Sequence, residues 1–387
     1  MRIDTSATIV ATTAHVDPIT LFASLELSKS RWLVTINSPA SEKFSKHVVE
    51  GGDGVSLLGL LARLRAKAEQ RCGAPVVVMV IQEAGLDGFW IHRLLRANGI
   101  ESHVVDAASI AVDRRHRRAK TDAIDGETLL RALMAWARGE RRVCSMVRVP
   151  SPEEEDRRRL TRERGTLLKE RIQHTNRIKG LLSGQGIRDY DPLVRGAVDR
   201  LEALRTGDGL PLPPLLKAEI RRELDRIALV TAQLASVERA RDMLVRTEAV
   251  EQNNPAALLV KLRGIGPEFA SILWLESLFR DFGNRRQIAA YAGLAPSPWQ
   301  SGSIDRDQGI SKSGNRYLRH TMIELAWFWL RHQPDSAVSQ WFQARVGCRK
   351  GRIRRIAIVA LARKLLIALW RYVTQGIVPE GAVFKAA

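Results

Sequence analysis

Cysteine, acidic residues and long apolar runs are all scarce in this sequence of 387 residues. Three cysteines, Cys72, Cys144 and Cys348, stand far apart, which excludes a zinc knuckle. So sparse and odd a count is typical of a protein in a reducing cytoplasm. Residues 1–18 lack a basic start followed by an apolar core, so we expect no signal peptide there.

The longest apolar run is RIRRIAIVALARKLLIALW, residues 352–370. Arg363 and Lys364 interrupt it, so the run is not apolar enough to span a bilayer. It could form a basic amphipathic helix on a surface. We favour a helix that closes the last domain and turns its cations toward a phosphate backbone.

Acidic residues are outnumbered, because 61 Lys and Arg stand against 42 Asp and Glu, a formal net charge of +19. Such a charge on a chain that is 45% hydrophobic predicts a folded protein with a polyanionic partner. The cations also come in local clusters, which favours nucleic acid over a merely soluble basic protein. The length suggests two or three domains.

Short strands alternate with helices from residue 20 to residue 150, which is typical of an α/β layered domain. The hydrophobic periodicity predicts strands at residues 21–27, 31–37, 46–50, 76–83 and 102–105, and helices at 55–68, 89–97 and 123–138.

A charged segment of helical period, residues 151–250, comes next, and TGDGLPLPPLL at residues 206–216 interrupts it with Gly and Pro. These features predict an antiparallel helical hairpin. Its role could be that of a spacer or, as we prefer, of an oligomer contact. Residues 251–387 are predicted to form a third, mostly helical domain.

Four acidic residues occupy positions from which a carboxylate site can form. Glu26 and Glu83 each end a strand, and Asp122 and Asp125 open a helix in KTDAIDGETLL. The i, i+3 spacing puts both aspartates on one helical face. Alternatively, the glutamates are surface acids and the aspartates complement the helix N-terminus. Together the four predict a site for one or two Mg²⁺ ions, which can clamp the attacking and leaving oxygens of a phosphoryl displacement.

A cationic run comes directly before these aspartates. Its members are Arg114, Arg115, Arg117, Arg118 and Lys120. A charge run is usually a solvated face, but beside an acid cluster we expect this one to hold the scissile strand.

The segments SLELSK, IQEAG and KTDAID, in this order, resemble the DEDD transposases of the insertion-sequence-110 family. The stretch from LVKLRGIGPEF to SKSGNRYLRHTM is similar to that family's second conserved domain. The resemblance implies a RuvC-like (RNase H-like) domain at residues 20–150, a helical coiled-coil linker at 151–250 and a transposase domain at 251–387.

The same resemblance implies a bacterial, cytoplasmic DNA recombinase with Mg²⁺ as cofactor. Its expected partners are the DNA of the element ends and the target, a bridge RNA that guides it, and further copies of the chain in a dimer or tetramer. By the resemblance, Glu83, Asp122 and Asp125 take the last three acidic positions of the family motif. The first position is normally Asp, whereas Glu26 stands there with one methylene more, and Mg²⁺ tolerates poor octahedral geometry badly.

The resemblance places a nucleophilic serine, which forms a covalent phosphoserine link with DNA, at Ser301 in PWQSGSIDRDQ. A serine hydroxyl needs a base or a metal to activate it. The alternative is structural, because Ser-Gly is ordinary turn chemistry. The rival serines are Ser303, Ser311 and Ser313.

The C-terminal region carries further candidates for nucleic-acid contact. RGIGPEFA, with Gly264 and Gly266, resembles a helix-hairpin-helix turn, in which backbone amides approach phosphate, although it could be only a tight turn between helices. Trp299 and Tyr317 could stack on bases, with core packing an equal alternative for Tyr317. The candidate donors are Lys312, Asn315, Arg316, Arg319, Arg345, Arg349, Lys350, Arg352, Arg354 and Arg355.

Three functions stay open at this point. The leading one is an RNA-guided DNA recombinase that uses a serine. The second is a metal-dependent nuclease or junction resolvase in which Ser301 is only structural. The third is a decayed transposase that binds nucleic acid without catalysis, and the substitution at Glu26 supports it.

The basic clusters predict a binding affinity for DNA that depends steeply on salt, because each Lys or Arg contact with a phosphate releases counterions. With about six or more such contacts, the association constant should fall by about 10³ or more between 50 mM and 200 mM salt. A fluorescence-anisotropy titration across this range measures the slope, and nearly salt-independent affinity would contradict the assignment.

Overall fold

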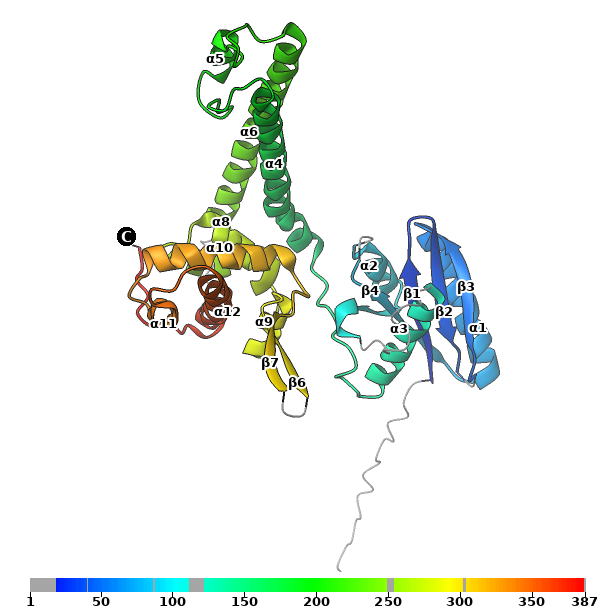
Figure 1. The fold of residues 1–387 in the computed structure, drawn as a ribbon. Helices are drawn as coiled ribbons and strands as arrows, with labels where there is room; N and C mark the ends of the chain where they lie inside the picture. The colour runs from blue at the N-terminus through cyan, green and yellow to red at the C-terminus, as the bar shows by residue number, and fades with distance from the viewer. Residues whose placement is uncertain are drawn as a thin grey trace, which may run out of the picture. The chain divides into compact units, whose positions relative to one another are not determined.

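The structure is a computed structural model that describes residues 19–39, 41–85, 88–110, 122–248, 254–301 and 304–385. The chain divides into two compact units, residues 1–150 and residues 151–387 (Figure 1). The segment predicted as a linker therefore shares one unit with the C-terminal region.

The N-terminal unit is built on a five-stranded sheet in the order β3-β2-β1-β4-β5. Its strands are β1 (Ile19–Leu27), β2 (Arg31–Asn37), β3 (Phe44–Glu50), β4 (Val76–Glu83) and β5 (Glu101–Val105). β2 pairs antiparallel with both β1 and β3, whereas β4 runs parallel to both β1 and β5. β1 and β4 are central and rich in apolar residues, as expected for strands covered on both faces.

Helices cover both faces of this sheet. α1 (Gly54–Cys72) and α2 (Trp90–Ala97) pack on one face, where Leu25 of β1 is buried among their leucines and isoleucine. α3 (Asp122–Ala137) packs on the opposite face, where Leu129 and Leu133 meet Ile81 of β4. Because side chains alternate along a strand, every second residue of β1 and β4 points toward α3.

The second unit begins with a long helical hairpin. α4 (Pro152–Ser183) starts at a capping box, in which Ser151 accepts a hydrogen bond from the Glu154 amide and the Glu154 side chain accepts one from Ser151. α6 (Pro214–Glu248) packs along α4, and α5 (Ala197–Ala203) lies at the closed end of the hairpin (Figure 1).

The apolar seam of the hairpin differs in part from the predicted one. Leu167 and Ile178 are buried as expected, but Ile172 is 51% exposed. On α6, Val230 is buried, whereas Thr231, which we expected on the stripe, is exposed. Successive contacts in a packed helix pair alternate between three and four residues, and both misplaced residues are one position away from that repeat.

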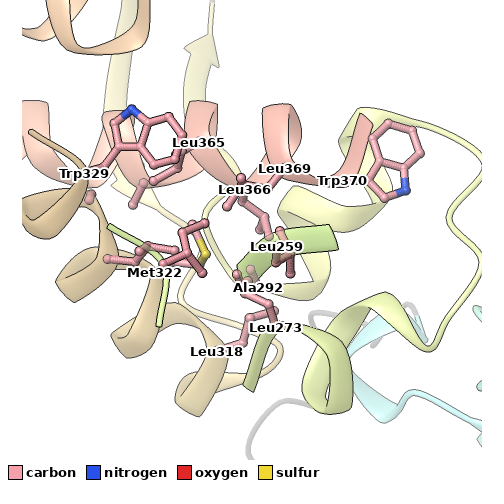
Figure 2. Close-up of a cluster of buried hydrophobic side chains, with 14 of the residues drawn as sticks. Leu259, Leu273, Ala292, Leu318, Met322, Trp329, Leu365, Leu366, Leu369 and Trp370 are labelled. Carbon is pink, nitrogen blue, oxygen red and sulfur yellow. The ribbon is translucent and has the colours of Figure 1, made fainter. Parts of the chain in front are cut away.

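The C-terminal region of this unit is mostly helical. Its elements are α7 (Pro255–Val260), α8 (Pro267–Leu273), the π-helical turn η3 (Trp274–Leu278), α9 (Arg285–Tyr291), β6 (Pro296–Ser301), β7 (Ile304–Ile310), α10 (Arg316–His332), α11 (Ala337–Val346) and α12 (Arg352–Gln375). α12 supplies Leu365, Leu366 and Leu369 to the core, where they meet Met322 and Trp329 of α10 (Figure 2).

The predicted α/β N-terminal region, helical hairpin and mostly helical C-terminal region are confirmed. Every N-terminal strand and helix that the periodicity predicted is present. The short helix α5 and the antiparallel hairpin of β6 and β7 were not predicted. Within the described ranges, no helix is long and apolar enough to cross a membrane.

Candidate active site

Two of the predicted acids end adjacent parallel strands. Leu25 of β1 pairs with Gln82 of β4, so Glu26 and Glu83 are the next residues along the two strands. Side chains alternate along each strand, which turns both glutamates to the face that α3 covers. Both are half-buried, and Oε1 of Glu26 is shielded from solvent. The sheet therefore presents two carboxylates side by side.

The first turns of α3 lie over this part of the sheet. α3 begins at Asp122, and Asp125 is half-buried. The Ser24 hydroxyl of β1 donates to the carbonyl oxygen of Gly126 at 2.7 Å. A Cβ atom built on Gly126 would lie only 3.5 Å from Cγ of Glu26. The start of the helix that carries the two aspartates thus reaches the end of β1.

Carboxylate oxygens are the kind of ligand that a hard divalent cation prefers. Mg²⁺ is usually held by one or two carboxylates together with waters and substrate phosphates, rather than by a full cage of protein ligands. Among the side chains that the structure describes, no three His, Cys, Asp or Glu lie close enough together to hold a metal ion. The side chain of Asp122 lies outside the described part, as does the whole cationic run at residues 113–120.

Ser301 is the last residue of β6 and pairs with Ile304 of β7, so it lies at the tip of the two-stranded hairpin. Its side chain and residues 302–303, which include the rival Ser303, lie outside the described residues. Ser311 and Ser313 follow β7 in an exposed loop. The acids and Ser301 belong to different units of the chain.

The glycine turn between α7 and α8 has the form expected of a tight turn between helices. Gly264 has a φ of +88°, a left-handed conformation that favours glycine, and a Cβ there would lie 2.8 Å from Cβ of His332. Gly266 is the N-cap of α8 and has open space in front of it. Gly264 is therefore required by the packing, whereas Gly266 leaves room for a ligand at its backbone.

The predicted nucleic-acid contacts of the C-terminal region fall into two groups. Arg319 donates from Nη1 to the carbonyl oxygen of Lys312 at 3.0 Å. The Tyr317 hydroxyl donates to the carbonyl oxygen of Thr161 at 3.1 Å. Both side chains therefore make hydrogen bonds within the protein. The other cations are exposed at the ends of helices and in the loops between them. These are Lys312, Arg316, Arg345, Arg349, Lys350, Arg352, Arg354 and Arg355.

The chain matches two family models. Residues 28–186 match a DEDD transposase model, and residues 256–340 match the model of the IS116/IS110/IS902 transposase family. The chain is also 58% identical over 384 residues, 97% of each chain, to y4rJ, a candidate transposase of Sinorhizobium fredii. The chain belongs to the IS116/IS110/IS902 transposase family.

More distant relatives agree with this assignment. The transposase for insertion sequence element IS1111A of Coxiella burnetii is 27% identical over 77% of this chain and 78% of its own. The pilin gene-inverting protein of Moraxella bovis is 31% identical over 32% of this chain and 38% of its own. This transposase is therefore an enzyme that acts on DNA, and the predicted family and enzyme class are confirmed.

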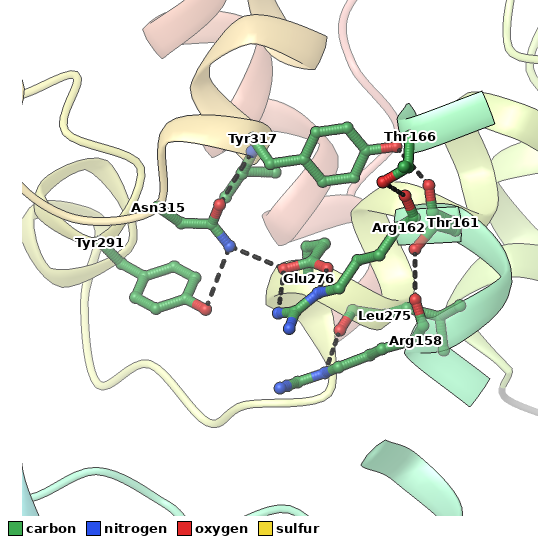
Figure 3. A network of polar contacts seen from close by, with 10 residues as sticks. Arg158, Thr161, Arg162, Thr166, Leu275, Glu276, Tyr291, Asn315 and Tyr317 are labelled. Atoms are coloured by element: carbon green, nitrogen blue, oxygen red, sulfur yellow. Dashed lines mark hydrogen bonds and ion pairs between the residues drawn. The ribbon is translucent and has the colours of Figure 1, made fainter. Parts of the chain in front are cut away.

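In the transposase, one buried carboxylate joins the base of the helical hairpin to the C-terminal region. Glu276 of η3 is 2% exposed and accepts hydrogen bonds from Arg162 Nε of α4 at 3.0 Å and from Asn315 Nδ2 at 2.9 Å (Figure 3). Asn315 also caps α10 by accepting a hydrogen bond from the Leu318 amide. The sequence did not single out Glu276, because nothing in WLESLFR marks its burial.

A second guanidinium lies in the same network. Arg158 is buried, donates from Nε to the carbonyl oxygen of Leu275 at 2.8 Å and lies over the ring of Phe279. Burial lowers the pKa of Arg158, and the negative charge of Glu276 opposes that shift. The nearby Tyr317 has its pKa raised to about 12, first by burial and then by the charge of Glu276.

We expect Glu276→Gln to lower the free energy of unfolding of the transposase by about 3 kcal/mol, because it removes the buried carboxylate that pairs with Arg162 and whose charge favours the cation of the buried Arg158. Denaturant unfolding of both proteins measures the change. The matched control is Glu219→Gln, which removes an exposed pair with Arg177 and should cost less than about 1 kcal/mol. Equal losses in the two variants would contradict the role of Glu276.

Proposed function

We propose that this transposase cuts and rejoins the DNA of an insertion sequence with a metal-dependent site in a RuvC-like (RNase H-like) domain at residues 20–150. The observation that carries the proposal is the side-by-side position of Glu26 and Glu83 at the ends of two parallel strands, under the helix that begins at Asp122. The acidic tetrad is completed by Asp125, one turn into that helix.

The residues of this site have separate tasks. Glu26 and Glu83 supply carboxylates from the sheet, and Asp122 and Asp125 supply them from α3. When bound, a divalent cation, which we take to be Mg²⁺, supplies charge stabilisation at the oxygens of the scissile phosphate. The cationic run Arg114, Arg115, Arg117, Arg118 and Lys120 precedes this helix in the sequence and binds the phosphates of the strand to be cut.

The second part of the proposal concerns rejoining. The Ser301 hydroxyl attacks the scissile phosphorus, its oxygen forms a bond to phosphorus, and the bond from phosphorus to the leaving strand's oxygen breaks, while the hydroxyl proton passes to that oxygen. The phosphodiester is thereby conserved as a phosphoserine link, so a second strand can be joined without an energy-rich cofactor. The position of Ser301 at the end of β6, where the chain turns toward β7, supports this proposal.

The proposed partners are DNA, a bridge RNA and further copies of the chain. The support for nucleic acid is the formal charge of +19 together with exposed cations such as Arg349, Lys350 and Arg352. We assign residues 151–250 to a helical coiled-coil linker that makes an oligomer contact and residues 251–387 to the transposase domain. A hydrolytic nuclease that lacks a covalent step remains the second candidate, because its chemistry needs only the carboxylates.

We expect Asp122→Asn and Asp125→Asn to reduce strand cleavage by about 10³-fold or more, because each change removes a negative charge that holds the metal. DNA binding and thermal stability should stay close to those of the parent protein, since Asn has nearly the same size and shape as Asp. Cleavage of end-labelled element DNA in Mg²⁺ measures the effect. Asp156→Asn on the exposed face of α4 is the matched control. Parent rates in both site variants would remove the metal site.

Ser301→Ala should bind DNA but form no covalent adduct with it, whereas Ser303→Ala and Ser311→Ala should still form one. The reason is that only the attacking hydroxyl becomes bonded to phosphorus. A denaturing gel of labelled DNA after the reaction, followed by peptide mapping, identifies the residue. Label on another serine would reject Ser301, and cut DNA with free ends and no adduct in the parent protein would favour the hydrolytic nuclease.

A further inference from the structure

α3 approaches the sheet most closely at a glycine that follows the last acid. Gly126 is buried and is the fifth residue of α3. Glycine inside a helix costs about 1 kcal/mol relative to alanine, so its presence there calls for a packing reason. The packing reason is the close approach to β2, since a Cβ at this position would lie 2.7 Å from Oγ1 of Thr35.

Two small polar residues form the seat of Gly126. Ser24 of β1 and Thr35 of β2 are cross-strand partners, and both are fully buried. Ser24 donates to the Gly126 carbonyl oxygen at 2.7 Å, whereas the Thr35 hydroxyl has no hydrogen-bond partner among the described residues. Thr35 is branched at Cβ and enclosed, so it has little freedom to turn away. The helix and the sheet therefore meet here at a fixed distance.

We infer that Gly126, seated on Ser24 and Thr35, is a positioning residue of the carboxylate site. Because no side chain separates α3 from the sheet, the helical turn that carries Asp125 comes down to the level of Glu26. This inference rests on the proposed function, since it takes the acids as the reacting site. The further point is that the absence of a Cβ at Gly126 sets the distance between the acids of the helix and those of the sheet.

A single methyl group tests this geometry. In Gly126→Ala the helix must rise by about 0.7 Å, the difference between 2.7 Å and an ordinary contact of 3.4 Å. A misplacement near 1 Å can cost about 100-fold in rate, so we expect cleavage to fall by about that factor. The Mn²⁺ concentration needed to raise the Tm of the DNA-free protein by a given amount should increase by about tenfold.

The rescue experiment is the Gly126→Ala, Thr35→Ala double variant. Removing Oγ1 of Thr35 deletes the 2.7 Å approach and leaves the Thr35 Cβ at 3.6 Å, an ordinary contact. Cleavage and the Mn²⁺ effect on Tm should then return to within about threefold of the Thr35→Ala single variant. If Gly126→Ala impaired the protein for a reason other than the clash with Thr35, removal of the Thr35 hydroxyl would not restore cleavage. If Gly126→Ala fails to fold, the double variant should regain both the fold and the Mn²⁺ effect.

The control for helix glycines is Gly59→Ala in α1, where a new Cβ would meet only the flexible end of Arg63 at 3.6 Å. It should leave cleavage and the Mn²⁺ effect unchanged. A parent-like Gly126→Ala, or a double variant as defective as Gly126→Ala, overturns the inference. If Asp122→Asn and Asp125→Asn also cleave at the parent rate, the proposed function itself fails, whereas inactive aspartate variants beside an active Gly126→Ala reject only the positioning role.

Discussion

The parallel pairing of β1 with β4 is the constraint on which the carboxylate site depends. Parallel strands in register bring their last residues to one edge of the sheet, so Glu26 and Glu83 become neighbours although 56 residues separate them in the sequence. The alternation of side chains then decides that both face α3. A slip of one residue in this pairing would turn one glutamate to the opposite face, where α1 and α2 bury the apolar core. The apolar core of the unit thus also fixes the direction of its acids.

In the second unit, a buried charge rather than strand register connects the helical hairpin with the C-terminal region. Glu276 accepts hydrogen bonds from α4 and from the cap of α10, and these elements lie more than 100 residues apart in the sequence. The loop that carries Ser311 and Lys312 ends at that cap. Glu276 therefore connects the end of this loop with α4, together with the hydrogen bonds from Tyr317 to Thr161 and from Arg158 to Leu275.

Much of the fold could be predicted from the sequence because its signals are local. The Val-rich run of β4 and the capping box at Ser151 each mark an element by composition or spacing. The acids could be proposed for the same reason, since each ends a strand or opens a helix. Glu276, Thr35 and Gly126 could not be found in this way, because their roles arise from burial against residues distant in the sequence. The β6–β7 hairpin was missed because its strands carry little apolar alternation.

The most direct test of the central claim is a crystal structure of the transposase grown with Mn²⁺, in which anomalous scattering locates the metal. The account predicts a peak at the C-terminal edge of β1 and β4, within coordination distance of oxygens of Glu26 and Glu83 and on the side that α3 covers. A well-occupied peak elsewhere, with none at this edge at saturating Mn²⁺, would contradict the carboxylate site.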